Sequence, residues 1–301
     1  MSYLGRLVSK TVINGKNKVH YLQTTENCCK KEETIMKKFL AMILAGVLAL
    51  SLAACGKSDK TSAGSSESDL EYVKNKGTLV VGITDFAPMD YKDDNWIGFD
   101  ADMAAAFAES LGVKVEFVEI TWDNKLMELK GKTIDCVWNG MTLTEDVVSA
   151  MECTKPYCNN QQIVIVKKEN ADKIKDKDSL KDLGWTYAVE SKSAGNEVAN
   201  ELGLKVTEVT AQSDALMEVA GGTSDAAIID SLMAAAMVGE GTSYENLTYT
   251  VGLNDEKYGV GFRKGSDLAE ELNKFFKASY DDGSMKTCAE KYGVQAALIE
   301  Q

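Results

Sequence analysis

The sequence predicts an α/β protein with two lobes, for three reasons. Beyond the first quarter of the chain, short apolar runs of strand type alternate with helices of amphipathic spacing, which is typical of parallel sheets covered by helices. The length of 301 residues allows two cores of ordinary size. Polar segments at 156–160 and 252–255 interrupt the alternation. If the chain crosses at both, residues 71–158 and 254–301 form one lobe and residues 162–250 the other, an arrangement suited to closing on a small ligand.

Each element is expected from its local pattern. Residues 78–83 (TLVVGI) form a continuous apolar run, which favours a buried strand. A helix over 100–111 follows from apolar residues at helical spacing, and Gly112 ends it. Residues 113–120 alternate as a strand with one buried face. The later strands are expected at 134–138, 163–166, 186–189, 226–229 and 258–262, and the later helices at 122–129, 194–202, 212–220, 230–238 and 266–280.

The amino-terminal part predicts an export signal over residues 36–54. Two lysines follow Met36, and residues 39–54 then form an uncharged run of 16 residues, shorter than the roughly 20 that a membrane-spanning helix needs. The run closes on Leu-Ala-Ala-Cys and resembles the lipobox of bacterial lipoproteins, which implies that Cys55 carries a lipid and becomes the first residue. The alternative is a short transmembrane anchor with a free cysteine.

The segments on either side of this signal are not expected to fold. Residues 1–35 precede a complete signal with its own Met, so we interpret them as upstream sequence from a wrongly placed start, the alternative being a genuine extension. Residues 55–70 are rich in Ser, Gly, Lys and Asp and nearly free of apolar side chains, which predicts a flexible tether.

Composition excludes several classes of function. The chain has a net charge of −13, and residues 55–301 alone carry 25 basic and 43 acidic side chains, a net of −18. Nucleic acid would be repelled by such a surface. The only histidine, His20, lies outside that part of the chain, so a Ser-His-Asp mechanism or a histidine metal site is not expected, and we expect no cofactor. A disulfide between Cys136 and Cys153 is conceivable, but free buried thiols are favoured.

Several segments together resemble the amino-acid-binding proteins of bacterial ABC importers. They are GITDFAPMDY, IGFDADMAAAFAESLGVKVEFVEITWD, GKTIDCVWNGMTLTEDVVSAMECTKPY, VESKSAGNEVANELG, GTSDAAIID and KYGVGFRKGSDL, in this order over residues 70–295. The resemblance implies the bilobed periplasmic-binding-protein fold of type II, with two parallel-sheet lobes joined by two hinge strands. It further implies a small-molecule ligand, an ABC permease as partner, and a lipid-anchored, extracytoplasmic protein that we expect to be a monomer.

The same resemblance implies a set of ligand-binding residues. It places aromatic faces at Phe86 and Phe99, and at Asp230 the carboxylate that pairs with the ammonium group of the ligand. An Asp at that point could instead cap the next helix, whereas Trp122 and Trp138 are more simply explained as core residues. The remaining positions implied by the family pattern are Asn139, Gly140 and Thr142 in the first lobe, and Ser193, Ala194 and Gly195 at a helix start whose N–H groups attract a carboxylate.

One departure from the family pattern concerns the acidic end of the ligand. The family pattern after Thr-x-Thr is two residues and then Arg, the clamp for the α-carboxylate, but here Thr144 is followed by Glu145, Asp146 and then Val147. Arg263 is the only arginine after residue 54, and the sequence does not show that it reaches the cleft. Either the helix-start amides and a lysine such as Lys192 replace the clamp, or the ligand is an amino-acid derivative, a short peptide or an amine.

The leading interpretation is therefore the substrate-binding component of an ABC importer and not an enzyme. The first alternative is a dehydratase-like enzyme on the same scaffold, for which Glu190 and Asp230 are the only carboxylates we would nominate as acid or base. The second is a ligand-binding sensor or adhesin.

Overall fold

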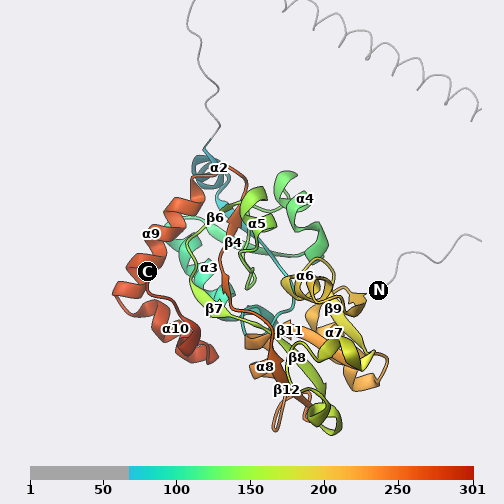
Figure 1. The fold of residues 1–301 in the computed structure, drawn as a ribbon. Coiled ribbons are helices and arrows are strands. Elements are labelled where there is room, and N and C mark those ends of the chain that lie inside the picture. The colour runs from blue at the N-terminus through green and yellow to red at the C-terminus, as the bar shows by residue number, and fades with distance from the viewer. Residues whose placement is uncertain (1–67) are drawn as a thin grey trace, which may run out of the picture. The chain divides into compact units, whose positions relative to one another are not determined.

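The computed structural model describes residues 68–301 (Figure 1). The expected export signal, Cys55 and nearly all of the expected tether lie outside the described residues. The first helix, α2 (Asp69–Lys76), begins where Ser68 Oγ accepts a hydrogen bond from the N–H of Glu71 at 3.0 Å, and it ends at Gly77 with φ of 77°. The last two residues of the expected tether therefore belong to a helix.

The first sheet contains five strands in the order β4-β1-β5-β14-β6. The interior strand β1 (Thr78–Ile83) pairs in parallel with β4 (Lys114–Glu119) and β5 (Cys136–Val137). The late strand β14 (Gly261–Phe262) returns to this sheet and lies antiparallel to β5 and to β6 (Glu152–Cys153). The other elements of this lobe are the hairpin β2 (Tyr91–Asp93) and β3 (Asn95–Ile97), the helices α3 (Phe99–Ser110), α4 (Lys125–Lys130), α5 (Glu145–Ala150), α9 (Leu268–Asp281) and α10 (Ser284–Tyr292), and the 3₁₀ turns η1 (Trp122–Asn124) and η4 (Gln295–Ala297).

The second sheet also contains five strands, in the order β10-β9-β11-β8-β12. Strand β9 (Thr186–Glu190) is parallel to β10 (Lys205–Val209) and β11 (Ala226–Asp230). Strand β8 (Gln162–Lys167) is antiparallel to β11 and to β12 (Leu247–Gly252). Helices α6 (Ala194–Glu201), α7 (Gln212–Gly221) and α8 (Ser231–Met237) and the 3₁₀ turns η2 (Lys168–Lys173) and η3 (Leu180–Leu183) complete this lobe.

Two short strands join the lobes. Strand β7 (Cys158–Asn160) leads into the second lobe, β13 (Glu256–Tyr258) returns from it, and the two are antiparallel partners. The predicted bilobed α/β fold with two hinge strands is confirmed. In detail, both sheets are mixed, because the strands that follow each crossing run antiparallel to their neighbours. The strand expected over 258–262 is two strands, since the chain leaves the hinge pair at Tyr258 and joins the first sheet only at Gly261.

The described cysteines are free thiols. Cys136 lies in β5 and Cys153 in β6, and β14 lies between these strands. Two strand spacings separate them by about 9.6 Å, whereas a disulfide needs Cα atoms within about 7 Å. The conceivable Cys136–Cys153 disulfide is therefore absent, and burial raises the pKa of the Cys136 thiol well above its usual value. None of the described helices is long and apolar enough to cross a bilayer.

Candidate functional site

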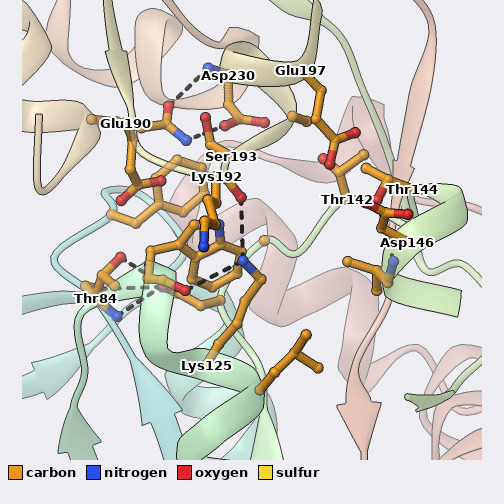
Figure 2. A pocket seen from close by; sticks show the side chains of 18 of the residues that line it. Thr84, Lys125, Thr142, Thr144, Asp146, Glu190, Lys192, Ser193, Glu197 and Asp230 are labelled. Carbon is orange, nitrogen blue, oxygen red and sulfur yellow. Dashed lines mark hydrogen bonds between the residues drawn. The ribbon is translucent and has the colours of Figure 1, made fainter. Parts of the chain in front are cut away.

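A cavity of about 130 Å³ lies where strands of both sheets end. Strand β1 ends at Ile83 and β5 at Val137 in the first lobe, while β9 ends at Glu190 and β11 at Asp230 in the second. Residues at or just after these ends line the cavity, as expected at the carboxyl edges of α/β sheets. Its lining is Thr84, Asp85, Phe86, Trp122, Lys125, Leu126, Asn139, Gly140, Thr142, Thr144, Asp146, Val147, Glu190, Lys192, Ser193, Ala194, Glu197, Gln212 and Asp230 (Figure 2).

The wall from the first lobe is held in place by the side chain of Asn139. Its Oδ1 accepts hydrogen bonds from the N–H of Thr84 at 2.8 Å and from the Thr84 hydroxyl at 2.6 Å. Its Nδ2 donates to Thr84 O at 3.2 Å and to Asp90 at 2.7 Å. Asn139 lines the cavity where the sequence placed it. Its amide is nevertheless occupied within its own lobe, so it fixes the loop after β1 rather than offering free groups to a ligand.

Gly140 brings an aromatic ring close to the backbone of this wall. It has φ of 53°, and a Cβ atom built there would lie 2.4 Å from Phe86 Cε1. The N–H of Gly140 donates to Asp100 Oδ2 at 2.7 Å, as does the hydroxyl of Tyr157 at 2.7 Å. Burial raises the pKa of Asp100 to about 7 despite these two donors. A residue with a side chain would displace Phe86, so glycine is needed here for packing as well as for backbone conformation.

Two aromatic residues line the cavity, and only one of them was predicted. Phe86 and Trp122 both do so, and they are 4% and 8% exposed. Phe99 does not reach the cavity: it is 1% exposed and lies with its ring centroid 6.2 Å from that of Tyr157. Phe99, predicted as an aromatic face for the ligand, instead packs in the core of the first lobe at the start of α3. Trp138 is buried against Phe276, as the core interpretation requires.

Asp230 ends β11 and faces the cavity from the second lobe. Its Oδ1 accepts hydrogen bonds from Gln162 Nε2 at 3.0 Å, from the Tyr258 hydroxyl at 2.8 Å and from Asn160 Nδ2, and its Oδ2 accepts from Gln212 Nε2. Within the described residues all of these donors are neutral. The pKa of Asp230 lies well above its usual value, because of burial and of the neighbouring Glu256 carboxyl. The helix-cap alternative is not what the structure shows, since Asp230 makes no side-chain capping bond to α8.

The Glu256 carboxyl lies behind Asp230, on the hinge strand β13. Its Oε1 accepts from Gln162 Nε2 at 2.8 Å, from Asn160 Nδ2 at 2.5 Å and from the Thr142 hydroxyl at 2.9 Å. Thr142 therefore lines the cavity with its hydroxyl already donated to the hinge. Asn160 and Gln162 donate to both carboxyls and hold the pair together.

Glu190 and Lys125 form the other polar part of the cavity. Glu190 is 4% exposed, and burial, reinforced by Asp230, raises its pKa to about 8. Lys125 is 7% exposed, and burial lowers its pKa to about 8, with Glu190 as the main opposing charge. Its Nζ donates to Lys192 O at 3.2 Å and to Trp122 O at 3.3 Å. The first of these bonds joins the two lobes.

The wall around Val147 is acidic or apolar. Val147 lines the cavity with Asp146, Glu197 and Ala194, and no arginine among the described residues does so. Arg263 instead binds Asp69, with Nε and Nη2 both 3.0 Å from carboxylate oxygens, and donates from Nη1 to Ile134 O at 2.9 Å. Its role is therefore to tie α2 to the first sheet.

The start of α6 keeps part of its predicted role. Ser193 and Ala194 line the cavity, and the Ser193 hydroxyl accepts from the N–H of Asn196 as the helix cap. Gly195 is not among the lining residues: a Cβ there would lie 2.8 Å from Gln162 Oε1 and 3.1 Å from Ile228 O, so this glycine allows the helix to pack on β11. Lys192 lines the cavity edge, but its ammonium pairs with Asp123 at 2.9 Å and is 71% exposed.

Several lining residues lie outside the predicted binding set, and Gln212, Trp122 and Lys125 illustrate why. Gln212 begins α7, and the sequence does not indicate a binding residue there, because a polar residue at a helix start usually faces solvent. The sequence predicts a core residue at Trp122, because the spacing of apolar residues is the same in a core as in a cavity wall. Lys125 lies in a short helix where a lysine is usually exposed.

The chain matches one protein family over most of its length, and its similar relatives are amino-acid-binding proteins. Residues 79–295 match the family described as bacterial extracellular solute-binding proteins, family 3. The arginine-binding extracellular protein ArtP of Bacillus subtilis is 29% identical over 265 residues, which cover 85% of this chain and 98% of the relative. The L-cystine-binding protein TcyA of the same organism is 30% identical over 268 residues, covering 85% and 97%.

A solved structure agrees with these relatives. An amino acid ABC transporter substrate-binding protein from Streptococcus pneumoniae, bound to L-arginine, is 28% identical with a TM-score of 0.68. The match covers 78% of this chain and all of that one (100%).

Proposed function

The chain belongs to family 3 of the bacterial extracellular solute-binding proteins, and from this premise we propose that it binds the ammonium group of its ligand through the carboxylate of Asp230. It is the substrate-binding component of an ABC importer for an amino acid or an amino-containing derivative. Like the relatives named above, it is a binding protein and not an enzyme.

The observation that carries the ammonium assignment is the uncompensated acidity around Asp230. The carboxyl is 4% exposed, and its described hydrogen-bond donors are amides and one phenol. A buried carboxylate without a cation is costly, and the group stays protonated instead. A ligand ammonium would supply the missing charge and displace the proton, so binding gains a charge-assisted hydrogen bond where the free protein has none.

The other lining residues supply groups for the rest of the ligand. Phe86 and Trp122 offer aromatic faces to its apolar part. Gly140, Thr142, Ser193 and Ala194 also line the cavity, and the helix-start N–H groups after Ser193 would attract a carboxylate. Because ligand groups would touch residues of both lobes, binding favours the closed arrangement over an open one.

The acidic end of the ligand has no arginine to meet. With Val147, Asp146 and Glu197 all lining the cavity, a free carboxylate would meet no arginine among the described residues, and the first N–H groups of α6 are the donors that the family pattern offers it. We therefore propose a ligand class that includes amino-acid derivatives, short peptides and amines as well as amino acids, with the ammonium group as the shared feature.

A thermal-shift screen tests the assignment. Amino acids, their amides, dipeptides and amines are added to the purified protein; a ligand at about 100 times its dissociation constant adds about 2.7 kcal/mol of stability, or about 5–10 °C in Tm for a protein of this size. The Asp230→Asn variant keeps the shape and removes the charge, so the shift should disappear.

The matched control is Asp172→Asn, an exposed aspartate of η2 in the same lobe, which should keep the full shift. Retention of the full shift by Asp230→Asn would refute the ammonium assignment.

We further propose that Cys55 is lipidated and holds a monomeric protein at the outer face of the membrane, next to the permease of the importer. The support is the Leu-Ala-Ala-Cys sequence after an uncharged run. In a bacterial host, the Cys55→Ser variant should leave the membrane fraction; membrane retention of this variant would contradict lipid anchoring. Sedimentation of the lipid-free protein as a dimer would contradict the monomer.

A further inference from the structure

The ammonium group of Lys125 occupies a position inside the cavity wall that has the features of a cation-binding subsite. It lies 4.5 Å from the centroid of the Trp122 ring and donates to two carbonyl oxygens, Lys192 O at 3.2 Å and Trp122 O at 3.3 Å. Figure 2 shows Lys125 and Asp230 approaching the cavity from opposite sides. An aromatic face and carbonyl groups are the partners that proteins use to recognise ammonium and guanidinium groups.

The charges around this position are also those of a cation subsite. Of the acidic side chains around Lys125, Glu190 from the end of β9 has the largest effect on its pKa, followed by Asp123 of η1 and Glu197 of α6; below its own raised pKa of about 8, Glu190 is a protonated acid that still accepts through its carbonyl oxygen. The only other basic side chain of the cavity lining, Lys192, turns its ammonium to Asp123 and solvent. Lys125 thus satisfies acidic and carbonyl groups that would otherwise face a cavity without a cation.

We infer that Lys125 occupies, from within the chain, the subsite that would otherwise hold a cationic side chain of the ligand, and so makes the protein selective for ligands with a short or uncharged side chain. The inference rests on the proposed function, because it assumes that the ammonium group of the ligand is bound at Asp230. The cavity of about 130 Å³ is what remains once Lys125 is in place. A ligand with an arginine-like side chain would meet a like charge and a filled volume.

This inference separates the protein from the relatives named for arginine. One is an arginine-binding protein and the other is bound to L-arginine, a cationic ligand, whereas here the side chain of Lys125 supplies the cation. The expected ligand is an amino compound whose side chain ends before Lys125 or packs on its methylene groups.

The test compares three ligands on the purified full-length chain by titration calorimetry. L-alanine has a short side chain, L-arginine a long cationic one, and L-citrulline has nearly the shape of arginine without its charge. The unaltered protein should bind alanine more tightly than arginine. Lys125→Ala empties the subsite and should strengthen arginine binding at least tenfold, and citrulline binding by less.

Two further variants keep the outcome interpretable. Lys125→Met keeps the volume of the stem and removes the charge, so it should raise the arginine-to-citrulline affinity ratio at least threefold even if the alanine variant does not fold. Lys130→Ala removes an exposed lysine of the same helix, outside the cavity lining, and should change none of the affinities by more than twofold.

Three results would overturn the inference: arginine binding that is unchanged in Lys125→Ala, arginine bound more tightly than alanine by the unaltered protein, or no binding of any of the three ligands to either protein. A failure of the ammonium assignment looks different. Adding Asp230→Asn to Lys125→Ala should abolish the new arginine binding; if that binding persists, Asp230 is not the ammonium partner although the subsite stands.

Discussion

The buried carboxyl of Glu190 predicts an unusual fall of stability toward neutral pH. Burial and the neighbouring Asp230 raise its pKa from 4.5 to about 8. At pH 7 the folded protein therefore keeps a proton that the unfolded chain has lost, so the stabilisation that is complete below the unfolded pKa declines as the pH rises to about 8. Between pH 5 and pH 7 this one group should reduce the free energy of unfolding by about 2.5 kcal/mol, at about 1.4 kcal/mol per pKa unit.

The variant that isolates this effect is Glu190→Gln, which resembles the protonated acid and does not titrate. Near pH 5 it should have about the stability of the unaltered protein, and at pH 7 it should be more stable by about 2 kcal/mol. The pKa values of three other buried carboxyls, Asp90, Asp100 and Asp230, are also raised. These groups lower the free energy of unfolding with rising pH in both proteins, so the difference in stability between the two proteins reports Glu190.

Urea unfolding, followed by tryptophan fluorescence at both pH values, measures the quantity directly. The matched control is Glu169→Gln, on the exposed face of η2 in the same lobe, which should follow the unaltered protein at both pH values. If Glu190→Gln were instead less stable at pH 7, Glu190 would have to be ionised and paired with Lys125, and the argument from burial would be refuted.

Two further predictions concern the wall of the first lobe. Val147→Arg places a guanidinium beside the cavity, and a hydrogen bond to a charged group contributes about 1.5–3 kcal/mol. Calorimetry should therefore find that an amino acid binds about 10–100-fold more tightly, whereas the affinity for its amide is unchanged. An equal gain in affinity for both ligands would show that the new arginine does not contact the carboxylate. Gly140→Ala places a Cβ 2.4 Å from Phe86 Cε1, so thermal unfolding should show a loss of stability of about 1–3 kcal/mol from overpacking. The control is Gly184→Ala, where φ is a similar 65° and no atom lies within 4 Å of the new Cβ. The control should show the backbone cost alone, and Gly140→Ala should lose the overpacking energy in addition to it. Equal losses for the two glycines would mean that the ring yields freely.

Much of the fold could be predicted because its signals are local. The runs at 78–83 and 226–229 are apolar over nearly their whole length, and both belong to interior strands that are largely buried. The strand β10 (Lys205–Val209) was not predicted, because an edge strand with exposed residues has no such run. Its place in the sheet comes from parallel pairing with β9, a tertiary contact that local spacing does not encode.

The candidate site was predictable only in part, for a related reason. Asp230 ends a buried strand, and a carboxylate at such a point is conspicuous in a sequence. Phe99 and Trp122 carry the same hydrophobic signal, yet the first packs on Tyr157 and the second lines the cavity. Whether a buried aromatic residue lines a cavity or packs in the core depends on the tertiary arrangement of the elements around it. The spacing of apolar residues within one element does not encode that arrangement.

The placement of basic side chains connects these observations. The only arginine of the described chain, Arg263, is bound to Asp69 and donates to Ile134 O in the first lobe, and the exposed Lys192 is bound to Asp123. Among the described residues, Lys125 is thus the one basic side chain buried in the cavity wall, and Glu190 is the acidic group with the largest effect on it. Under the proposed function, the cavity has Val147 where the family pattern implies an arginine for the acidic end of the ligand, and the buried Lys125 where we infer the subsite for its side chain. The double variant with Val147→Arg and Lys125→Ala should therefore bind arginine more tightly than either single variant. The new arginine would supply a partner for the carboxylate of the ligand, and the loss of Lys125 would free the groups that can bind its guanidinium.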